Sequence, residues 1–400
     1  MRLPLLIISL CSLAGACARD VSTPPARVGT TPLRDTLAAL TKHFADSLHL
    51  PGLAVGIWQG DSLLFDLAQG RSALPGGAPI STASVFHMAS ISKPFVATAI
   101  MQLVERRQLE LDAPITQYLP YFRMKDARAA RITARQLLRH VAGLPDVTDY
   151  RWDHAEYDAG SLERYIRELK DSSLVGEPGV APRYSNIGFE VLADVVAKVS
   201  GESFDDYMQR HILTPLKMTQ STFLMTDMDS SRMAWGHSAD SASGQYRRTA
   251  VYPYNRRHAG SSTLHSSIND MMRWVRANLR GGELDGVRIM QPETHAELWK
   301  PSWDLTGDVE RDAKKAGVPM PYDSLALGYS WERMVRRGRL LVMHSGSDVG
   351  FSTDMVLAPR DSLGIVVLVN ADGVDTRTLS FRLLDRVGSA RLVPGGSHRE

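Results

Sequence analysis

The chain has 400 residues, 44% of them apolar, and a formal net charge of +2 at neutral pH. This length supports one large domain or two closely joined ones, and the balanced charge gives no reason to expect binding to nucleic acid or to an anionic membrane. Both cysteines, Cys11 and Cys17, lie in the first 20 residues, so the body has no thiol chemistry or disulfide framework, and no cofactor or metal is expected.

Residues 1–18 have the pattern of an export signal. Arg2 gives a positive start, Leu3 to Leu13 form an apolar run too short for a typical spanning helix, and Ala14-Gly15-Ala16 fits a cleavage site. Cys17 follows directly, which resembles a bacterial lipoprotein signal. Free export to the periplasm and anchoring through a lipidated Cys17 both stay open, with an ordinary buried segment as the alternative. Residues 19–33, rich in Pro and Thr, predict a tether.

The first third of the body combines helices and a hairpin. Apolar spacing predicts a helix from Leu33 to Leu48, and residues 53–65 read as two strands around a turn. A further helix is expected to begin near Ser90. Pro94 is compatible with that helix only because it falls within the first turn.

The middle third is mostly helical in pattern and the end returns to strands. Helices are predicted to begin at a Thr133 cap and to cover Gly188 to Val199, Phe204 to Ile212 and Ser267 to Leu279. Strands are predicted at Leu340 to Met343, Ser352 to Leu357 and Gly364 to Val369, before a helix from Thr376 to Val387. This order predicts an α+β fold, with a sheet part at about 34–92 and 320–390, a helical part between, and a polar tail at 391–400.

Ser90-Ile91-Ser92-Lys93 is the first candidate for chemistry. A serine hydroxyl needs a base to become a good nucleophile, and residues three apart share one face of a helix. Among nine lysines, only Lys93 has a serine three residues before it. To act as the base, the amine must lose its charge through burial or nearby cations. In the alternative reading, Ser90 only caps the helix and Lys93 is solvated; Ser92 is a poorer nucleophile because adjacent helical residues point apart.

Tyr184-Ser185-Asn186 is the second candidate. Among twelve tyrosines, Tyr184 alone is followed two residues later by asparagine. In a cationic pocket the phenol would titrate low enough to relay protons to a leaving group, and the Asn186 amide would reach a substrate carbonyl. The alternative is structural, with Tyr184 packing the loop and Asn186 capping the next helix.

His344-Ser345-Gly346, at the end of a predicted strand, is the third candidate. Such an edge can pair with an extended substrate, Gly346 lets backbone come close to the ligand, and the N–H groups of Ser90 and Ser347 can form an oxyanion hole. His258-Ala259-Gly260 and Lys315-Ala316-Gly317 also fit the [His/Lys]-x-Gly pattern. Neither lies among predicted strands, so His344 is preferred.

The three triplets, in this order, resemble the serine β-lactamase and penicillin-binding superfamily. The Tyr-x-Asn form is similar to the class C β-lactamase branch, which also holds DD-peptidases, D-aminopeptidases and esterases. The resemblance covers about residues 34–390. It implies an antiparallel sheet flanked by helices plus an all-α domain, with the active site between them.

The resemblance also implies roles for single residues. Ser90 would be acylated, Lys93 and Tyr184 would move protons, and Asn186 would orient the substrate. His344 stands where class C β-lactamases have lysine, and a neutral histidine would hold a substrate carboxylate less firmly. The expected function is therefore hydrolysis of an amide, peptide or ester, including D-amino-acid or cell-wall-derived substrates, through an acyl-enzyme. The alternatives are β-lactam hydrolysis and a non-catalytic penicillin-binding sensor.

Overall fold

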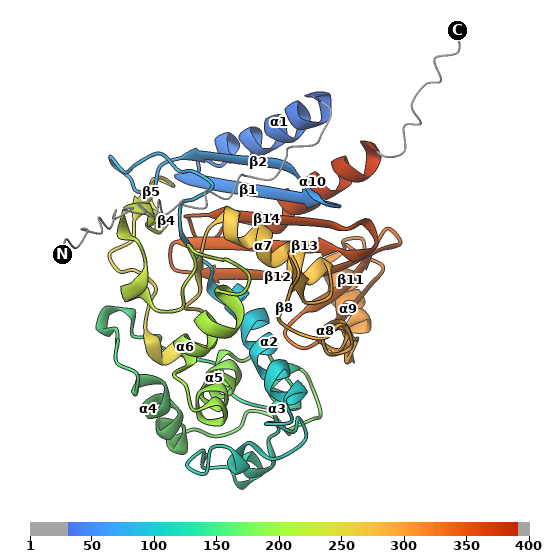
Figure 1. Cartoon of the computed structure of the whole chain (residues 1–400). Helices are drawn as coiled ribbons and strands as arrows, with labels where there is room; N and C mark the ends of the chain where they lie inside the picture. Colours follow the sequence, from blue (N-terminus) through green and yellow to red (C-terminus); the bar gives the residue numbers. More distant parts are fainter. Residues whose placement is uncertain (1–30, 391–400) are drawn as a thin grey trace, which may run out of the picture.

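The computed structural model describes residues 31–390, which are organised around one antiparallel sheet (Figure 1). Its strands lie in the order β2 (Ser62–Gly70), β1 (Gly52–Gln59), β14 (Leu363–Val369), β13 (Phe351–Ala358), β12 (Arg339–Asp348), β11 (Glu332–Arg336), β10 (Ser324–Leu327) and β9 (Trp303–Asp304). The first and last long strands are neighbours, with Leu53 opposite Val369. Segments from both ends of the chain therefore share one sheet, as the sequence predicted.

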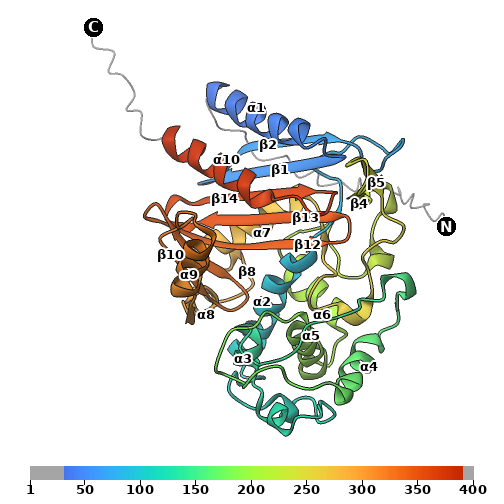
Figure 2. The same ribbon diagram turned by 180° about the vertical axis from the view of Figure 1, so that it is seen from behind.

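Both faces of the sheet are covered. Helices α1 (Thr31–Ser47) and α10 (Thr376–Ala390) lie on one face, and α7 (Ile268–Leu279) lies on the other (Figures 1 and 2). Because side chains alternate along a strand, Val367 packs in the core beneath α1 and α10, whereas its neighbours Val366 and Leu368 pack on the α7 side. This double covering explains why the segment from Leu363 to Val369 is an unbroken apolar run.

Two glycines allow α7 to lie close to the sheet. A Cβ atom on Gly364 would stand 2.2 Å from Cγ1 of Val275, and one on Gly56 would stand 2.8 Å from Cγ2 of Ile268. Helix α7 thus belongs to the sheet side, although it falls inside the stretch predicted to form the helical part. Strand β9, at residues 303–304, also joins the sheet ahead of the predicted boundary at 320.

A second region beneath the sheet is formed by helices α2 (Ser92–Glu105), α3 (Ala134–Leu138), α4 (Ser161–Glu168), α5 (Asn186–Ser200) and α6 (Phe204–Met208). Helix α2 runs down into this region from the sheet (Figure 1). Helices α8 (Pro292–Trp299) and α9 (Thr306–Ala316) lie at the other end of the sheet, where α9 contacts β10 (Figures 1 and 2). Three short strand pairs complete the fold: β3 (Phe86–His87) with β6 (His265–Ser266), β4 (His237–Ala239) with β5 (Tyr246–Arg248), and β7 (Glu283–Leu284) with β8 (Val287–Arg288). Within residues 31–390, no helix has both the length and the apolar character needed to cross a bilayer.

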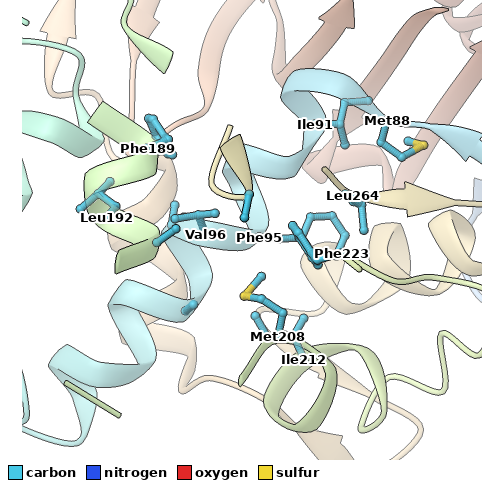
Figure 3. Close-up of a cluster of buried hydrophobic side chains, with 14 of the residues drawn as sticks. Met88, Ile91, Phe95, Val96, Phe189, Leu192, Met208, Ile212, Phe223 and Leu264 are labelled. Carbon is cyan, nitrogen blue, oxygen red and sulfur yellow. The ribbon is translucent and has the colours of Figure 1, made fainter. Parts of the chain in front are cut away.

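Aromatic packing joins α2 to the sheet side. The Phe95 ring stacks on Trp274 of α7 at 3.7 Å between centroids and meets the edge of Phe223 at 6.2 Å. Figure 3 shows Phe95 and Phe223 within a cluster that also holds Val96, Phe189 and Leu264. Because this core surrounds α2, the start of that helix is held in one position relative to the sheet.

The predicted helix ends agree closely with the structure. Thr133 forms a capping box with Gln136, Ser267 accepts a hydrogen bond from the backbone of Asp270, and Gly201 ends α5 with a φ of +74°. The first helix begins at Thr31 instead of Leu33, so it includes the last residues assigned to the tether. The rest of the tether, the export signal with Cys11 and Cys17, and the tail at 391–400 lie outside the described residues.

Candidate active site

Ser90 lies in a one-turn 3₁₀ helix, Ala89–Ile91, which leads directly into α2. The preceding residue, Ala89, has a φ of +48°, a conformation that costs a non-glycine residue on the order of 1 kcal/mol and is concentrated at functional sites. The turn is held from the sheet, because Oγ1 of Thr353 donates to the carbonyl of Met88 at 3.1 Å. Ser92 is buried and its hydroxyl donates to the carbonyl of Ala89, so the structure presents Ser90 and not Ser92.

Lys93 is fully buried and directed at Ser90. Its Nζ lies 2.8 Å from Oγ of Ser90 and donates to the carbonyl of Ser261 at 3.0 Å. Burial lowers the pKa of the amine from 10.5 to about 8, against the opposing effect of Glu190, Asp348 and Asp146. A substantial fraction of Lys93 is therefore uncharged in weakly alkaline solution and able to accept a proton. The alternative of a solvated lysine is wrong.

Tyr184 reaches the same oxygen from the loop that precedes α5. Its hydroxyl donates to Oγ of Ser90 at 2.9 Å, and Nζ of Lys93 lies 5.0 Å from its ring centroid. The ring stacks on His140 at 4.4 Å, and Nδ1 of His140 accepts a hydrogen bond from the backbone of Ser185. Burial and the nearby Lys93 hold the pKa of His140 well below its ordinary value, so a neutral imidazole supports the phenol. The hydroxyl, the amine and the phenol thus meet at one point.

The expected acidic phenol is not found. Loss of water around the hydroxyl raises the pKa of Tyr184, and Asp146 and Asp348 raise it further, although 47% of the residue is exposed. The hydrogen bond with Ser90 opposes this shift without reversing it. The sequence interpretation assumed a cationic pocket, whereas burial and the carboxylates of Asp146 and Asp348 raise the pKa of the phenol although the Lys93 amine lies near its ring. Tyr184 is therefore a neutral phenol in the resting site, and it donates a hydrogen bond to Ser90.

Asn186 is the first residue of α5, and Ser185 is its cap, so the alternative in which Asn186 caps the helix is wrong. Asp146 fixes Asn186 by accepting from its backbone N–H at 2.8 Å and from Nδ2 at 3.0 Å. This clamp holds the amide beside Tyr184, so that the whole Tyr184–Asn186 segment has one defined orientation.

His344, Gly346 and Ser347 lie on the part of β12 that extends beyond β11. Pairing with β11 stops at Met343, whereas pairing with β13 continues to Asp348. The strand edge at residues 344–348 is thus available on the β11 side, next to the Ser90 turn. Ser347 is exposed on this edge.

Gly346 has a structural role that the sequence did not show. A Cβ atom there would lie 2.4 Å from the carbonyl of Met88 and 3.1 Å from Cβ of Ala89. The small residue therefore lets β12 approach the turn that carries Ser90, whereas its predicted closeness to a ligand stays a prediction.

His344 is buried, and its Nδ1 lies 2.7 Å from the carbonyl of Ser345. Burial and the nearby Lys93 lower the pKa of the ring to about 3, so His344 is neutral at physiological pH. The two competing triplets do not lie on the sheet edge: His258 ends a 3₁₀ turn, Arg256–His258, in the loop behind Lys93, and Lys315 is exposed near the end of α9.

Sequence reasoning missed several residues that shape the site. His140 supports the phenol, Asp146 holds Asn186, and Asp348 lies 2.7 Å from Nε2 of His87. Glu190 and Ser261 form a buried hydrogen bond behind Lys93. One signal was available, because Glu190 is a charged residue inside the otherwise apolar run from Ile187 to Ala193.

Residues 37–387 match the family model described as Beta-lactamase. Among curated proteins, the chain is 24% identical over 345 residues to Protein flp of Staphylococcus aureus (strain MW2). That alignment covers 85% of this chain and 64% of the relative, so the chain spans less than two thirds of the relative's length.

Three solved structures share the fold. The octameric penicillin-binding protein homologue from Pyrococcus abyssi has a TM-score of 0.76 and 22% identity, with 89% of this chain and 77% of that chain covered. The D-amino acid amidase from Ochrobactrum anthropi SV3, complexed with L-phenylalanine amide, has a TM-score of 0.73 and 18% identity, with 90% and 100% covered. A class C beta-lactamase has a TM-score of 0.71 and 18% identity, with 94% and 100% covered. The predicted sheet-plus-helices fold is confirmed.

Proposed function

Since this chain belongs to the beta-lactamase family, we propose that it is a serine hydrolase in which Ser90 forms an acyl-enzyme. One observation carries the proposal: the Oγ atom of Ser90 is contacted at once by Nζ of Lys93 at 2.8 Å and by the hydroxyl of Tyr184 at 2.9 Å. A nucleophile next to a base and a proton donor is the arrangement that acyl transfer requires.

In the acylation step, uncharged Lys93 accepts the proton of Ser90 while Oγ attacks the substrate carbonyl carbon. The negative charge that develops on the carbonyl oxygen is stabilised by the N–H groups of Ser90 and Ser347, and Asn186 orients the substrate. Tyr184 protonates the leaving group as the bond to it breaks, and the ammonium of Lys93 then restores the phenol. The raised pKa of Tyr184 supports this role, because the phenol holds its proton until the leaving group needs it.

Deacylation uses the same groups in reverse order. A water molecule attacks the ester formed on Ser90, and uncharged Lys93 accepts its proton while Tyr184 remains a neutral phenol. Collapse of the tetrahedral intermediate releases the acid and returns a proton to Oγ of Ser90.

For the substrate, we propose an amide, peptide or ester whose acyl part carries no obligatory carboxylate. His344 is neutral, and the groups facing the reaction centre include the carboxylates of Asp146 and Asp348. This charge pattern favours neutral or amine-bearing acyl groups, such as those of D-amino acid amides and D-alanyl peptides. The fold shared with a D-amino acid amidase is consistent with that choice.

Hydrolysis of β-lactams is the second candidate. The contact between Tyr184 and Ser90 favours it, since it matches the class C pattern seen in the sequence. Both candidates are tested by assaying the purified chain and a Ser90→Ala variant against nitrocefin, p-nitrophenyl esters and D-alanyl peptides in parallel. We expect turnover of esters or peptides to exceed that of nitrocefin and to fall by at least about 10⁴-fold in Ser90→Ala. Fast nitrocefin turnover would favour the second candidate, and a stable acyl adduct without turnover would favour the non-catalytic sensor.

We also propose that the protein is exported to the periplasm, either free or attached to the membrane through a lipidated Cys17. The apolar run and the small residues before Cys17 support this. Mass spectrometry of the mature N-terminus tests it, because free export and lipidation leave different masses, and an intact Met1 in extracted protein would contradict export.

A further inference from the structure

A buried carboxylate stands behind the proposed base. Glu190 of α5 is completely buried. Its Oε2 accepts the backbone N–H of Gly260 at 2.8 Å, and its Oε1 accepts the hydroxyl of Ser261 at 2.5 Å. The carbonyl of that same Ser261 accepts the ammonium of Lys93 at 3.0 Å. A continuous chain of hydrogen bonds therefore runs from Glu190 through the 260–261 backbone to Lys93.

The shape of the loop makes this contact specific. A Cβ atom on Gly260 would lie 2.0 Å from the carbonyl of Phe189, so glycine is required for the loop to touch α5. His258, at the start of the loop, is buried with its Nδ1 3.5 Å from Oε1 of Glu190, and its ring meets the edges of Tyr150 and Tyr165. The carboxylate thus holds the loop at a point where the loop cannot move away without breaking buried hydrogen bonds.

We propose that Glu190 is a positioning residue, which fixes the 258–261 loop so that the Ser261 carbonyl holds the Lys93 amine against Ser90. This inference rests on the proposed function, because it assumes that Lys93 activates Ser90. Of the three hydrogen bonds that connect Glu190 to Lys93 through the loop, Glu190 makes two. Because Glu190 accepts both a backbone N–H and a hydroxyl, it can fix the loop to within the fraction of an ångström that proton transfer needs.

The charge of Glu190 has a second effect on Lys93. The groups that face the amine are the carboxylates Glu190, Asp348 and Asp146, the neutral rings of His140 and His344, and the phenol of Tyr184. Glu190 is the strongest of the groups that oppose the effect of burial. Removing its charge should therefore move the acid limb of Ser90 reactivity to lower pH, which a purely structural role would not do.

The test measures how fast diisopropyl fluorophosphate labels Ser90 between pH 6 and pH 10, followed by mass spectrometry of the intact chain. In this reaction Oγ forms a bond to phosphorus, fluoride leaves, and Lys93 takes the proton, so the rate reports activation of Ser90 without a substrate pocket. The variants are Glu190→Gln, which keeps the shape and removes the charge, Glu190→Ala, which removes both, and Ser261→Ala, which removes one hydrogen bond. The control is Asp194→Asn, a buried carboxylate one turn further along α5 that bonds to Tyr121.

For the wild type we expect labelling to rise with pH through about 8. Glu190→Gln should shift this limb down by about 1 pH unit, while Glu190→Ala should in addition lose about 10-fold to 100-fold in the plateau rate. Ser261→Ala should lose less than Glu190→Ala, and Asp194→Asn should match the wild type.

The outcomes separate the two proposals. If wild-type Ser90 is not labelled at all, the proposed function fails and the inference fails with it. If the wild type is labelled and both Glu190 variants, folded by circular dichroism, keep its limb and its plateau, only the role of Glu190 is overturned. A loss of rate in Asp194→Asn equal to that in Glu190→Ala would also overturn it, since any buried charge on α5 would then have the same effect.

Discussion

The core under α1 and α10 consists of apolar side chains, whereas the buried wall behind Ser90, formed by Lys93, Glu190 and Ser261, contains ionisable and polar ones. Both regions are buried to the same degree. Leu53, Val367 and Leu379 in the first are completely buried apolar side chains, whose burial stabilises the fold by about 1.5 to 3 kcal/mol each. Lys93 and Glu190 in the second are completely buried ionisable groups, which stabilise nothing unless they are paired. The difference indicates that burial of the apolar sheet core offsets the cost of burying the ionisable groups of the wall.

The free-energy cost of burying Lys93 follows from the shift in its pKa. Folding lowers the pKa of Lys93 from 10.5 to about 8. At about 1.4 kcal/mol for each pH unit, holding the ammonium in this environment costs about 3 kcal/mol. That is a large fraction of the free energy of unfolding of an ordinary domain, about 5 to 15 kcal/mol.

The largest expected effect is on activity. Lys93→Met should lower turnover of any accepted substrate by about 10²-fold to 10⁴-fold, because the proton of Ser90 then has no positioned base. The measurement is kcat/KM of the purified variant, with circular dichroism as the check on folding. Turnover within tenfold of the wild type would show that another group activates Ser90.

The converse effect is on stability alone. Leu379→Ala in α10 should lower the free energy of unfolding by about 2 to 5 kcal/mol through the cavity it leaves, while kcat/KM per folded molecule stays unchanged. Denaturant titration provides the first value, and Arg382→Ala, at an exposed position of the same helix, is the matched control. A parallel loss of kcat/KM in Leu379→Ala would mean that the two regions are not independent.

These two regions also differ in how far the sequence predicted them. The strand from Leu363 to Val369 and the cap at Thr133 follow from local patterns, as does the pairing of Ser90 with Lys93 within one turn of helix. The link from Asp146 to Asn186 spans 40 residues and that from Glu190 to Ser261 spans 71. No periodicity encodes such contacts, because they depend on how the loops pack.

The predicted direction of the Tyr184 pKa shift was wrong for the same reason. The sequence shows which ionisable groups exist but not how deeply they are buried or which of them face one another, and the pKa of the phenol proved to be raised by burial and by Asp146 and Asp348. The close approach of Gly346 to the Ser90 turn is a further contact that the sequence could not show, since its neighbour Met88 is more than 250 residues away in the chain.

A third prediction tests the free-energy cost of burying Lys93 directly. Between pH 8 and pH 10.5 the unfolded chain holds the Lys93 proton and the folded chain does not, so raising the pH through this window favours folding. Below pH 8 both states are protonated and the penalty is constant. The free energy of unfolding of the wild type, relative to Lys93→Met, should therefore rise by about 3 kcal/mol from pH 7 to pH 10.5. A difference that is flat across this range would mean that Lys93 keeps its ordinary pKa in the folded protein.

The smallest expected effect concerns the helical region away from the reacting atoms. In the capping box of α3, the Thr133 hydroxyl accepts from the backbone of Gln136, and Gln136 accepts from the backbone of Thr133. Thr133→Ala should cost about 1 kcal/mol of unfolding free energy, with Thr133→Ser as the control that retains the hydroxyl. Because α3 packs against α5, which carries Asn186 and Glu190, kcat/KM shows how rigidly the wall is held. Unchanged kcat/KM would mean that the hydrogen bonds of the wall fix the site by themselves, whereas a loss that Thr133→Ser restores would mean that the helix beneath it contributes to the alignment.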